Sequence, residues 1–215
     1  MRVVGKIFKY AFILLIISVF LLFFARCALM EFPKRAGELF PSDGMKQAYA
    51  AGGISVFTQE EIDERITSDG HFTTYAMRYV PATGELIITV RYNDGTLKDL
   101  AEKYEFDPAK LDVNAEYFDY SLLHTDGSRI APDAVESFRQ WRYSYRRLRF
   151  SGIDLSDSEL RELALEIYYN GSAGGKDDLD EDGEKKSFGT CFAYHCEWEL
   201  KEYELTPSDI SQLTK

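Results

Sequence analysis

The sequence lacks the short motifs that identify many enzymes directly. It has no phosphate-binding glycine loop, no nucleophile elbow, no paired His-Glu metal motif and no metal-finger spacing. Its only histidines are His71, His124 and His195. These absences favour a protein that is not an enzyme and holds no cofactor. A hydrolase whose site is assembled from distant loops is the enzymatic alternative.

Internal repeats are missing, and basic residues are scarce after position 36. Residues 1–36 carry six Lys/Arg and one acidic residue, whereas residues 37–215 hold 19 basic and 35 acidic residues, a formal charge of −16. The length of 215 residues predicts one folded domain with segments left over. Because an acidic domain repels a nucleic-acid backbone, no nucleic-acid partner is expected.

A long hydrophobic run occurs once, at the N-terminus, where the sixteen residues from Tyr10 to Ala25 carry no charge. We expect an uncleaved transmembrane anchor over residues 10–26, since the bulky Arg26 fits a signal-peptidase site poorly. A cleaved signal peptide is the alternative. The basic residues before the run predict a cytoplasmic N-terminus, residues 1–9, and an extracytoplasmic C-terminal part. The membrane is therefore one expected partner.

Proline and glycine gather in residues 27–53, which show little periodicity and are typical of a juxtamembrane tether. The folded domain is expected over residues 54–205, followed by a C-terminal tail, residues 206–215. Thr58 and Glu61 have the spacing of a capping box, so a short helix is expected to open the domain.

A period of two dominates the domain and predicts strands. Residues 73–80 and 85–92 are predicted to form a half-buried hairpin whose core face includes Leu86 and Ile88. A short helix is expected over residues 96–104. Further strands are expected over 116–123, with a turn at 126–127, over 138–150 with a bulge at Arg146 and Arg147, over 162–169 after one helical turn at 157–161, and over 188–203.

These elements predict a mainly β fold, an antiparallel sandwich of about seven strands with short helices at its edges. Between the last two strands, residues 170–187 are polar and rich in Gly and Asp, and we expect a mobile acidic loop there.

The stretch TCFAYHCEW, residues 190–198, resembles a reactive cluster. On an uninterrupted strand, however, Cys191 and Cys196 are five positions apart, so their side chains point to opposite faces. They would lie about 17 Å apart, which is too far for a disulfide. A disulfide would need a turn at the residues FAYH, which are poor turn formers. We expect unlinked cysteines, with Cys196 inward and Cys191 outward beside His195. A disulfide and a transition-metal site at Cys191 and His195 are the alternatives.

The acidic loop contains Asp178, Asp180 and Asp182 followed by Gly183, which matches the first half of an EF-hand calcium loop. Gly189 stands where such a loop has its bidentate Glu. We therefore expect a solvated loop, with weak calcium binding at the three aspartates as the alternative.

Five arginines are interleaved with Trp141, Tyr143 and Tyr145, a mixture that can bind polyanions. Because successive side chains of a strand point to opposite faces, the aromatic residues are predicted to lie on one face and most of the arginines on the other. We expect these arginines to pair with acidic residues on neighbouring strands, and a face for an anionic partner is the alternative. The five are Arg139, Arg142, Arg146, Arg147 and Arg149.

The strand pattern of ELIITVRYNDG, FDYSLLHTDGSRI and YSYRRLRFSGIDLS resembles immunoglobulin-like sandwich domains that an N-terminal anchor tethers to the membrane in uncharacterised bacterial surface proteins. The resemblance spans residues 72–203. It implies a binding or structural role at the cell envelope, with a protein or envelope component as partner and no catalytic residues.

Overall fold

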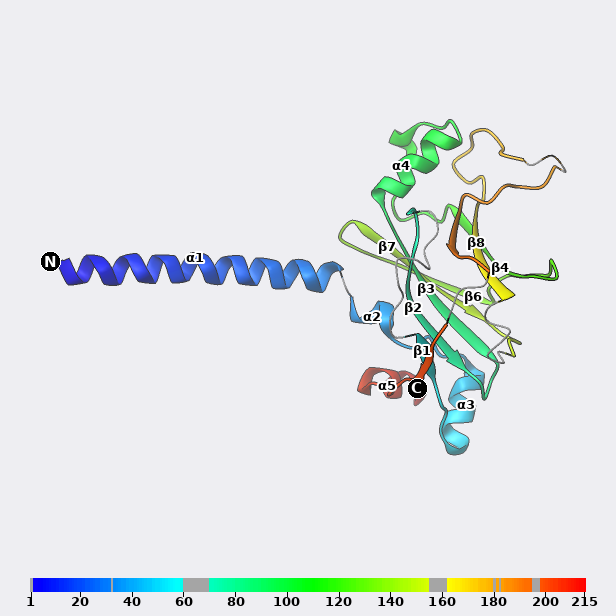
Figure 1. Cartoon of the computed structure of the whole chain (residues 1–215), viewed down its shortest axis with the longest axis horizontal. Coiled ribbons are helices and arrows are strands. Elements are labelled where there is room, and N and C mark those ends of the chain that lie inside the picture. The colour runs from blue at the N-terminus through cyan, green and yellow to red at the C-terminus, as the bar shows by residue number, and fades with distance from the viewer. Residues whose placement is uncertain are drawn as a thin grey trace. The chain divides into compact units, whose positions relative to one another are not determined.

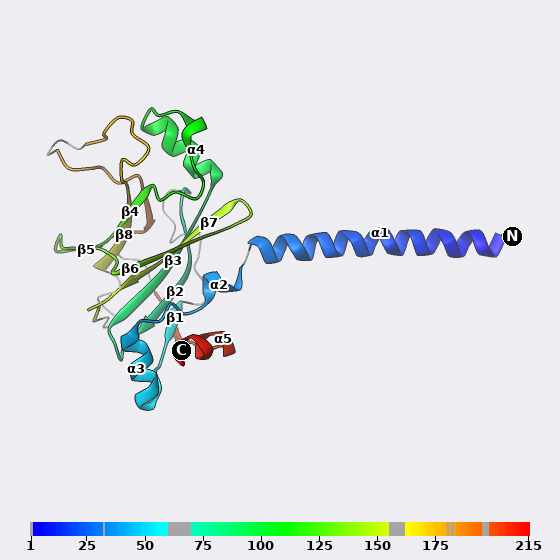
Figure 2. The ribbon, with the colours of Figure 1, turned by 180° about the vertical axis from the view of Figure 1, so that it is seen from behind.

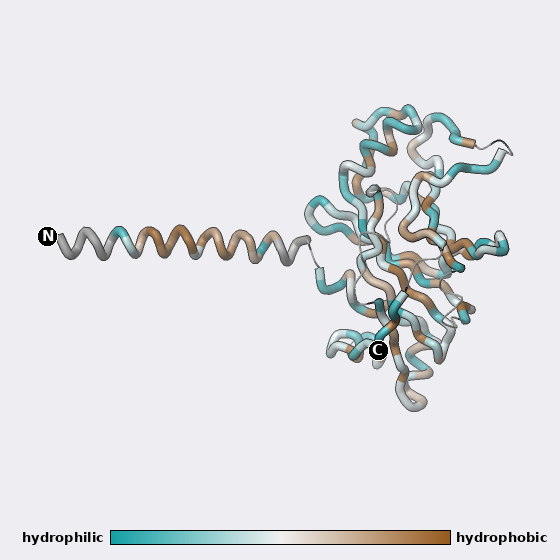
Figure 3. The backbone as a smooth tube through the Cα atoms, viewed as in Figure 1, coloured by the Kyte–Doolittle hydropathy of each residue, from teal (hydrophilic) through white to brown (hydrophobic). Residues whose placement is uncertain are grey.

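The computed structural model describes residues 2–31, 33–59, 70–154, 162–179, 181, 183–194 and 198–215. The chain divides into two compact units, Met1–Lys34 (unit 1) and Arg35–Lys215 (unit 2). Unit 1 consists mainly of α1 (Arg2–Glu31), in which Lys9–Cys27 is long and apolar enough to cross a bilayer. Figure 3 shows the hydrophobic middle of α1 in brown. The predicted apolar helix is confirmed, whereas its insertion and orientation stay predictions.

Unit 2 is mainly β, as predicted, and its strands form two antiparallel sheets (Figures 1 and 2). The six-stranded sheet A has the order β10-β1-β2-β3-β7-β6, and the four-stranded sheet B has the order β5-β4-β8-β9. The described residues thus contain ten strands, where the sequence predicts about seven. The strands are β1 (Phe57–Gln59), β2 (Thr73–Val80), β3 (Glu85–Asn93), β4 (Phe118–His124), β5 (Arg129–Ile130), β6 (Ala134–Gln140), β7 (Tyr143–Phe150), β8 (Leu163–Tyr169), β9 (Gly189–Phe192) and β10 (Leu200–Glu202).

The main core lies between the two sheets. Its residues are alternate residues of the strands, as the period of two in the sequence predicts. The hairpin β2–β3 is confirmed, and a core face of β3 contributes Leu86, Ile88, Val90 and Tyr92. Sheet B contributes alternate residues of β4 and β8, among them Phe118, Tyr120, Leu122, Leu165 and Ile167. The opposite face of β3 is also buried, with Ile87 1% exposed, so this strand is not half-buried as predicted.

A second core covers that other face of sheet A. It contains Leu39, Met45, Val56 and Leu213 packed against Val80 and Ile87 of the sheet. Residues 35–53 therefore belong to the folded unit and do not form the tether predicted for residues 27–53. They contain most of α2 (Lys34–Gly37) and α3 (Asp43–Gly52). In α3, Met45, Ala48 and Tyr49 have helical spacing behind the N-cap Ser42, a signal that the Gly- and Pro-rich composition of the segment outweighed in the prediction. The predicted C-terminal tail likewise contains α5 (Pro207–Leu213).

Residues 138–150 form parts of two strands and not the single strand predicted. Trp141 and Arg142 connect β6 to β7, and the register between them runs without a shift. The bulge predicted at Arg146 and Arg147 is therefore wrong. The turn contains no Gly or Asn, and Trp141 itself takes a positive φ of 55°, so the usual sequence signal of a two-residue turn is missing.

The predicted final strand, residues 188–203, is also wrong. β9 ends at Phe192 in sheet B, and β10 pairs with β1 in sheet A, so the chain changes sheets between them. A register shift in the β8–β9 pairing makes Cys191 the extra residue of a bulge. Cys191 is 0% exposed and packs in the main core, contrary to the outward position predicted for it.

The helices differ from the predictions in their boundaries. The predicted helix over 96–104 is confirmed as α4 (Asp94–Lys103), which begins earlier because the Asn93 side chain accepts hydrogen bonds from the first turn. A 3₁₀ helix, η2 (Pro108–Lys110), follows it. No helix begins at Thr58, which lies in β1, and the rest of that predicted helix, with the helical turn at 157–161, falls outside the described residues.

Candidate ligand-binding cleft

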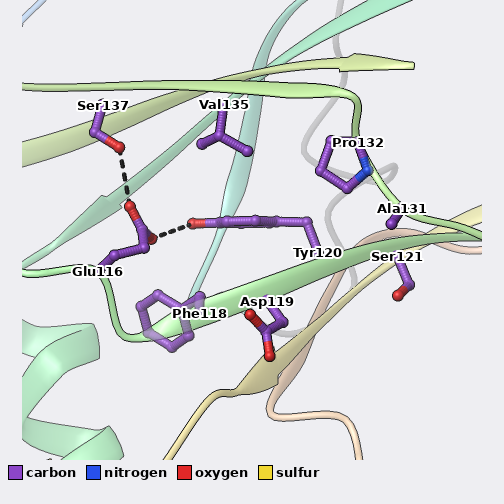
Figure 4. A pocket seen from close by; sticks show the side chains of 9 residues that line it. All are labelled: Glu116, Phe118, Asp119, Tyr120, Ser121, Ala131, Pro132, Val135 and Ser137. Carbon is purple, nitrogen blue, oxygen red and sulfur yellow. Dashed lines mark hydrogen bonds between the residues drawn. The ribbon is translucent and has the colours of Figure 1, made fainter. Parts of the chain in front are cut away.

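An open cleft of about 540 Å³ lies between β4 and β6, where one edge of sheet B faces one edge of sheet A. Its volume falls in the range of about 300–1,000 Å³ that is typical of small-ligand pockets. Figure 4 shows the residues that line it, namely Glu116, Phe118, Asp119, Tyr120, Ser121, Ala131, Pro132, Val135 and Ser137.

Both strands beside the cleft have an edge without a strand partner in the part of the chain that the structure describes. β6 is the last strand of sheet A, and β4 meets β5 only at Leu122 and Leu123. His124 donates its backbone N–H toward β5, so the N–H and C=O groups of even-numbered residues in β4 point to that side. The backbone groups of Phe118 and Tyr120 are therefore directed to the β6 side of β4, toward the cleft.

Glu116 forms the polar end of the cleft. Its Oε2 accepts hydrogen bonds from Arg146 Nε at 2.5 Å and Ser137 Oγ at 2.9 Å. Its Oε1 accepts a hydrogen bond from the Tyr120 hydroxyl at 3.3 Å, and Figure 4 shows this bond and the one from Ser137. Glu116 thus joins three donors from β4, β6 and β7. Its carboxylate is held in place as a hydrogen-bond acceptor.

The protonation states of the neighbouring groups suit this role. Burial, and next the charge of Glu116, raises the pKa of Tyr120 well above 10, so the hydroxyl stays a neutral donor. Burial alone would lower the pKa of the Arg146 guanidinium, but the nearby Tyr92, Tyr120 and Glu116 outweigh it and raise that pKa. Arg146 therefore keeps its charge although the residue is only 2% exposed.

The side walls of the cleft are less polar. Val135 is 43% exposed on β6, and Ala131 and Pro132 belong to the segment that connects sheet B to sheet A. Asp119 is exposed at the rim. The arrangement combines an apolar wall, the unpaired edge of β4 and a carboxylate end, which is suited to binding an extended chain with a basic or hydrogen-bond-donating group.

The structure does not bring the five predicted arginines together on one exposed face. Arg146 and Arg147 are buried on opposite faces of β7, and Arg142 lies in the β6–β7 turn. Four of the five lie beside carboxylates, but only Arg147 and Arg149 meet theirs on neighbouring strands, as expected. Arg139 binds Asp94 at 2.6 Å, Arg146 binds Glu116, Arg147 binds Glu136 of the neighbouring strand, and Arg149 lies 3.7 Å from Glu85.

Of the predicted calcium ligands, only Asp178 lies in the described part of the chain. Its two oxygens face lysines, Oδ2 at 3.3 Å from Lys103 Nζ and Oδ1 at 3.7 Å from Lys186 Nζ. A calcium ion at Asp178 would have to displace both ammonium groups. Asp180 and Asp182 lie outside the described residues, and the remaining described side chains include no cluster of three or more that could hold a metal ion.

The cysteine and histidine candidates are also dispersed. Cys191 is buried in β9, whereas His195 and Cys196 fall outside the described residues, so their disulfide and metal alternatives stay predictions. His71 lies 3.4 Å from a carboxylate oxygen of Asp99. His124 lies beside Asp126 and Glu162 near the β4–β5 turn.

Sequence reasoning missed the cleft. The sequence predicts a strand over residues 116–123, whereas β4 begins at Phe118, so Glu116 lies before the strand and no pattern marks it as a site residue. Its partner Arg146 is 30 residues away in sequence, and only the packing of two different sheets brings the pair together.

Comparison with known proteins adds no assignment, because no family model, no curated protein and no solved structure matches the chain.

Proposed function

We propose that this chain is a single-pass membrane protein whose extracytoplasmic unit is a non-enzymatic binding module. Its ligand is an extended peptide segment of a protein partner at the cell envelope, bound in the cleft between β4 and β6. One observation carries the proposal, namely that the unpaired edge of β4 opens onto a cleft whose opposite wall is β6, the last strand of sheet A. Peptides commonly bind such edges by adding a strand through main-chain hydrogen bonds.

The charges of the cleft support a basic ligand. Glu116 and Asp119 carry two negative charges there against the single positive charge of Arg146. Residues 37–215 have a formal charge of −16, which favours the approach of a cationic segment. The apolar Lys9–Cys27 segment and the basic residues before it support anchoring with unit 2 outside the cytoplasm. The proposal does not depend on an immunoglobulin-like strand order.

The test is selection of peptides from a displayed library of random sequences on the full chain in detergent micelles. Val135→Arg would fill the cleft with a cation, and Val113→Arg provides a matched control because Val113 is also exposed but does not line the cleft. We expect selected peptides rich in Lys, Arg and β-branched residues that lose at least about tenfold in affinity on Val135→Arg.

The same peptides should bind Val113→Arg as they bind the unchanged chain. Peptides that bind Val135→Arg with undiminished affinity, or a selection without enrichment, would contradict the proposal.

A further inference from the structure

The turn between β6 and β7 presents an exposed aromatic side chain in a strained backbone. Trp141 is 52% exposed and has a φ of 55°, a conformation that costs a bulky side chain about 1–3 kcal/mol. Gly or Asn would satisfy the same turn without that cost. A strained, exposed tryptophan at a hairpin tip therefore suggests a role outside the fold.

Alternating rings and guanidinium groups hold this tip. The guanidinium carbon of Arg142 lies 4.9 Å from the centre of the Trp141 ring and 5.1 Å from that of Tyr143. Arg91 continues the row, 4.8 Å from the ring of Tyr143 and 5.8 Å from that of Tyr75. Such cation–π contacts keep the arginines close to the aromatic surface and order the tip.

The row continues to the first residue of unit 2. Tyr75 packs edge to face on Tyr145 with ring centres 5.5 Å apart, and Tyr145 stacks on Phe138 at 5.1 Å. Arg35 lies 5.1 Å from the centre of the Phe138 ring and binds Glu136. The residue at which the chain enters unit 2 is thus fixed against β6. In both ribbon views the β6–β7 turn and α2 lie on the same side of unit 2 (Figures 1 and 2).

Covalent geometry limits how far Arg35 can be from a membrane that contains Lys9–Cys27. Arg35 stands eight positions after Cys27, and eight fully extended residues span at most roughly 28 Å. Trp141 follows Phe138 by three residues of β-hairpin, about 10 Å. The tip is therefore within reach of the surface of that bilayer.

We propose that the β6–β7 turn enters the interfacial region of the membrane, with Trp141 and Tyr143 among the lipid headgroups and Arg142 at the phosphates. Tryptophan and tyrosine are enriched at this depth because one end of each ring system is apolar and the other polar. The proposal rests on the membrane anchoring proposed above. It adds a second contact that would fix the orientation of unit 2 and the direction in which its cleft opens.

The charge distribution of unit 2 agrees with this orientation. Three arginines, Arg35, Arg91 and Arg142, belong to the row that ends at the tip, whereas residues 37–215 as a whole are strongly acidic. Anionic lipids would attract the tip and repel the rest of the unit.

Fluorescence of the full chain in lipid vesicles tests the proposal, since Trp141 and Trp198 are its only tryptophans. Trp198→Phe leaves Trp141 as the single reporter, and Trp141→Phe leaves the partly buried Trp198 as the control. The vesicles contain phosphatidylcholine with one-fifth phosphatidylglycerol, and phosphatidylcholine brominated near the headgroup or deep in the acyl chain acts as the quencher. Flotation of the vesicles reports anchoring independently.

We expect Trp141 emission at least twofold more quenched by the shallow bromines than by the deep ones, and Trp198 emission unaffected by either. A chain that floats with the vesicles while Trp141 stays unquenched would overturn the inference and leave anchoring intact. A chain that does not float would overturn anchoring and, with it, the inference.

Trp141→Gly should raise the melting temperature by relieving the positive φ. An unchanged or lower melting temperature would contradict the backbone strain at Trp141.

Discussion

Arg146 and Arg147 are neighbours in β7, and both are buried on opposite faces of sheet A, each in contact with a different glutamate. Arg146 points between the sheets to Glu116 in the cleft. Arg147 points to the second core, where it binds Glu136 and three backbone carbonyls. These two adjacent arginines thus contact the candidate binding site on one face of sheet A and the N-terminal segment of unit 2 on the other.

Substitution of Arg147 is predicted to destabilise the fold. Its Nη1 donates to the carbonyl oxygens of Arg35, Glu38 and Leu39 at 3.1–3.2 Å. Arg147→Met removes these donors and the partner of Glu136, and should lower the free energy of unfolding by about 3 kcal/mol. Urea denaturation measures the change, with the slope of the unfolding free energy against urea concentration expected to be the same in both proteins. Arg129→Met is the control, with an expected loss of about 1 kcal/mol or less, since Arg129 and its partner Glu184 form an exposed ion pair. Equal losses in both variants would contradict the anchoring role of Arg147.

Acid is predicted to weaken the attachment of α5. Burial would raise the pKa of Asp209, but hydrogen bonds from the Leu39 N–H and from Thr206 outweigh burial and lower it below its usual value. A lowered pKa in the folded state stabilises the fold above the unfolded value of about 4, and this contribution is lost as the pH falls below it. Stability measured between pH 2.5 and 7 should therefore fall at the acidic end.

Asp209→Asn should reduce the stability at pH 7 and flatten that acidic fall. Glu204→Gln, a change at an exposed neighbour, should leave the pH profile as it is in the unchanged chain. If Asp209→Asn and Glu204→Gln showed the same dependence of stability on pH, the attachment of α5 would not depend on the charge of Asp209.

The loop after β8 is predicted to depend on one glycine. A Cβ at Gly175 would collide with the carbonyl oxygen of Tyr104, which accepts the N–H of Lys176 at 2.8 Å. Gly174 also has a positive φ, but no described atom lies within 4 Å of a Cβ built there. Gly174→Ala should cost only about 1 kcal/mol of backbone strain, and Gly175→Ala distinctly more. Thermal unfolding of both variants compares them, and a smaller loss for Gly175→Ala would contradict the close approach.

Thiol labelling is predicted to find three reactive cysteines in denaturant, namely Cys27, Cys191 and Cys196. The expectation follows from the free thiols of Cys27 and Cys191 in the described part of the chain, and it extends the same prediction to Cys196. Under native conditions Cys191 should react slowly because its side chain is fully buried. A single thiol in unreduced, denatured protein, rising to three after reduction, would establish the disulfide alternative.

Calcium is predicted to leave the melting temperature unchanged. Asp178 already faces Lys103 and Lys186, and each ammonium group competes with a cation for its carboxylate. A titration of the full chain with calcium chloride, with magnesium chloride as the ionic-strength control, measures the effect. A rise specific to calcium that Asp178→Asn abolished would support the calcium loop.

The sequence by itself determined the features that depend on local periodicity. The uncharged run from Tyr10 to Ala25 specifies an apolar helix, because a helix satisfies its own backbone hydrogen bonds within an apolar segment. Alternation in residues 73–92 specifies the β2–β3 hairpin and its core face. The apolar positions after Thr96 specify α4, although not its start at Asp94. None of these features requires knowledge of which distant segment lies nearby.

Only the tertiary structure decided the features that depend on contacts between distant segments. The pairing of Glu116 with Arg146 needs two sheets packed together, and the folding of residues 35–53 onto sheet A needs the apolar face that Val80 and Ile87 present there. The turn at Trp141 and the change of sheet after Phe192 break no local pattern, because neither is marked by Gly or Pro. Periodicity records which side of a strand is apolar, but it does not record what covers that side. The cleft is one consequence, since it lies where β6, the last strand of sheet A, faces β4 of sheet B.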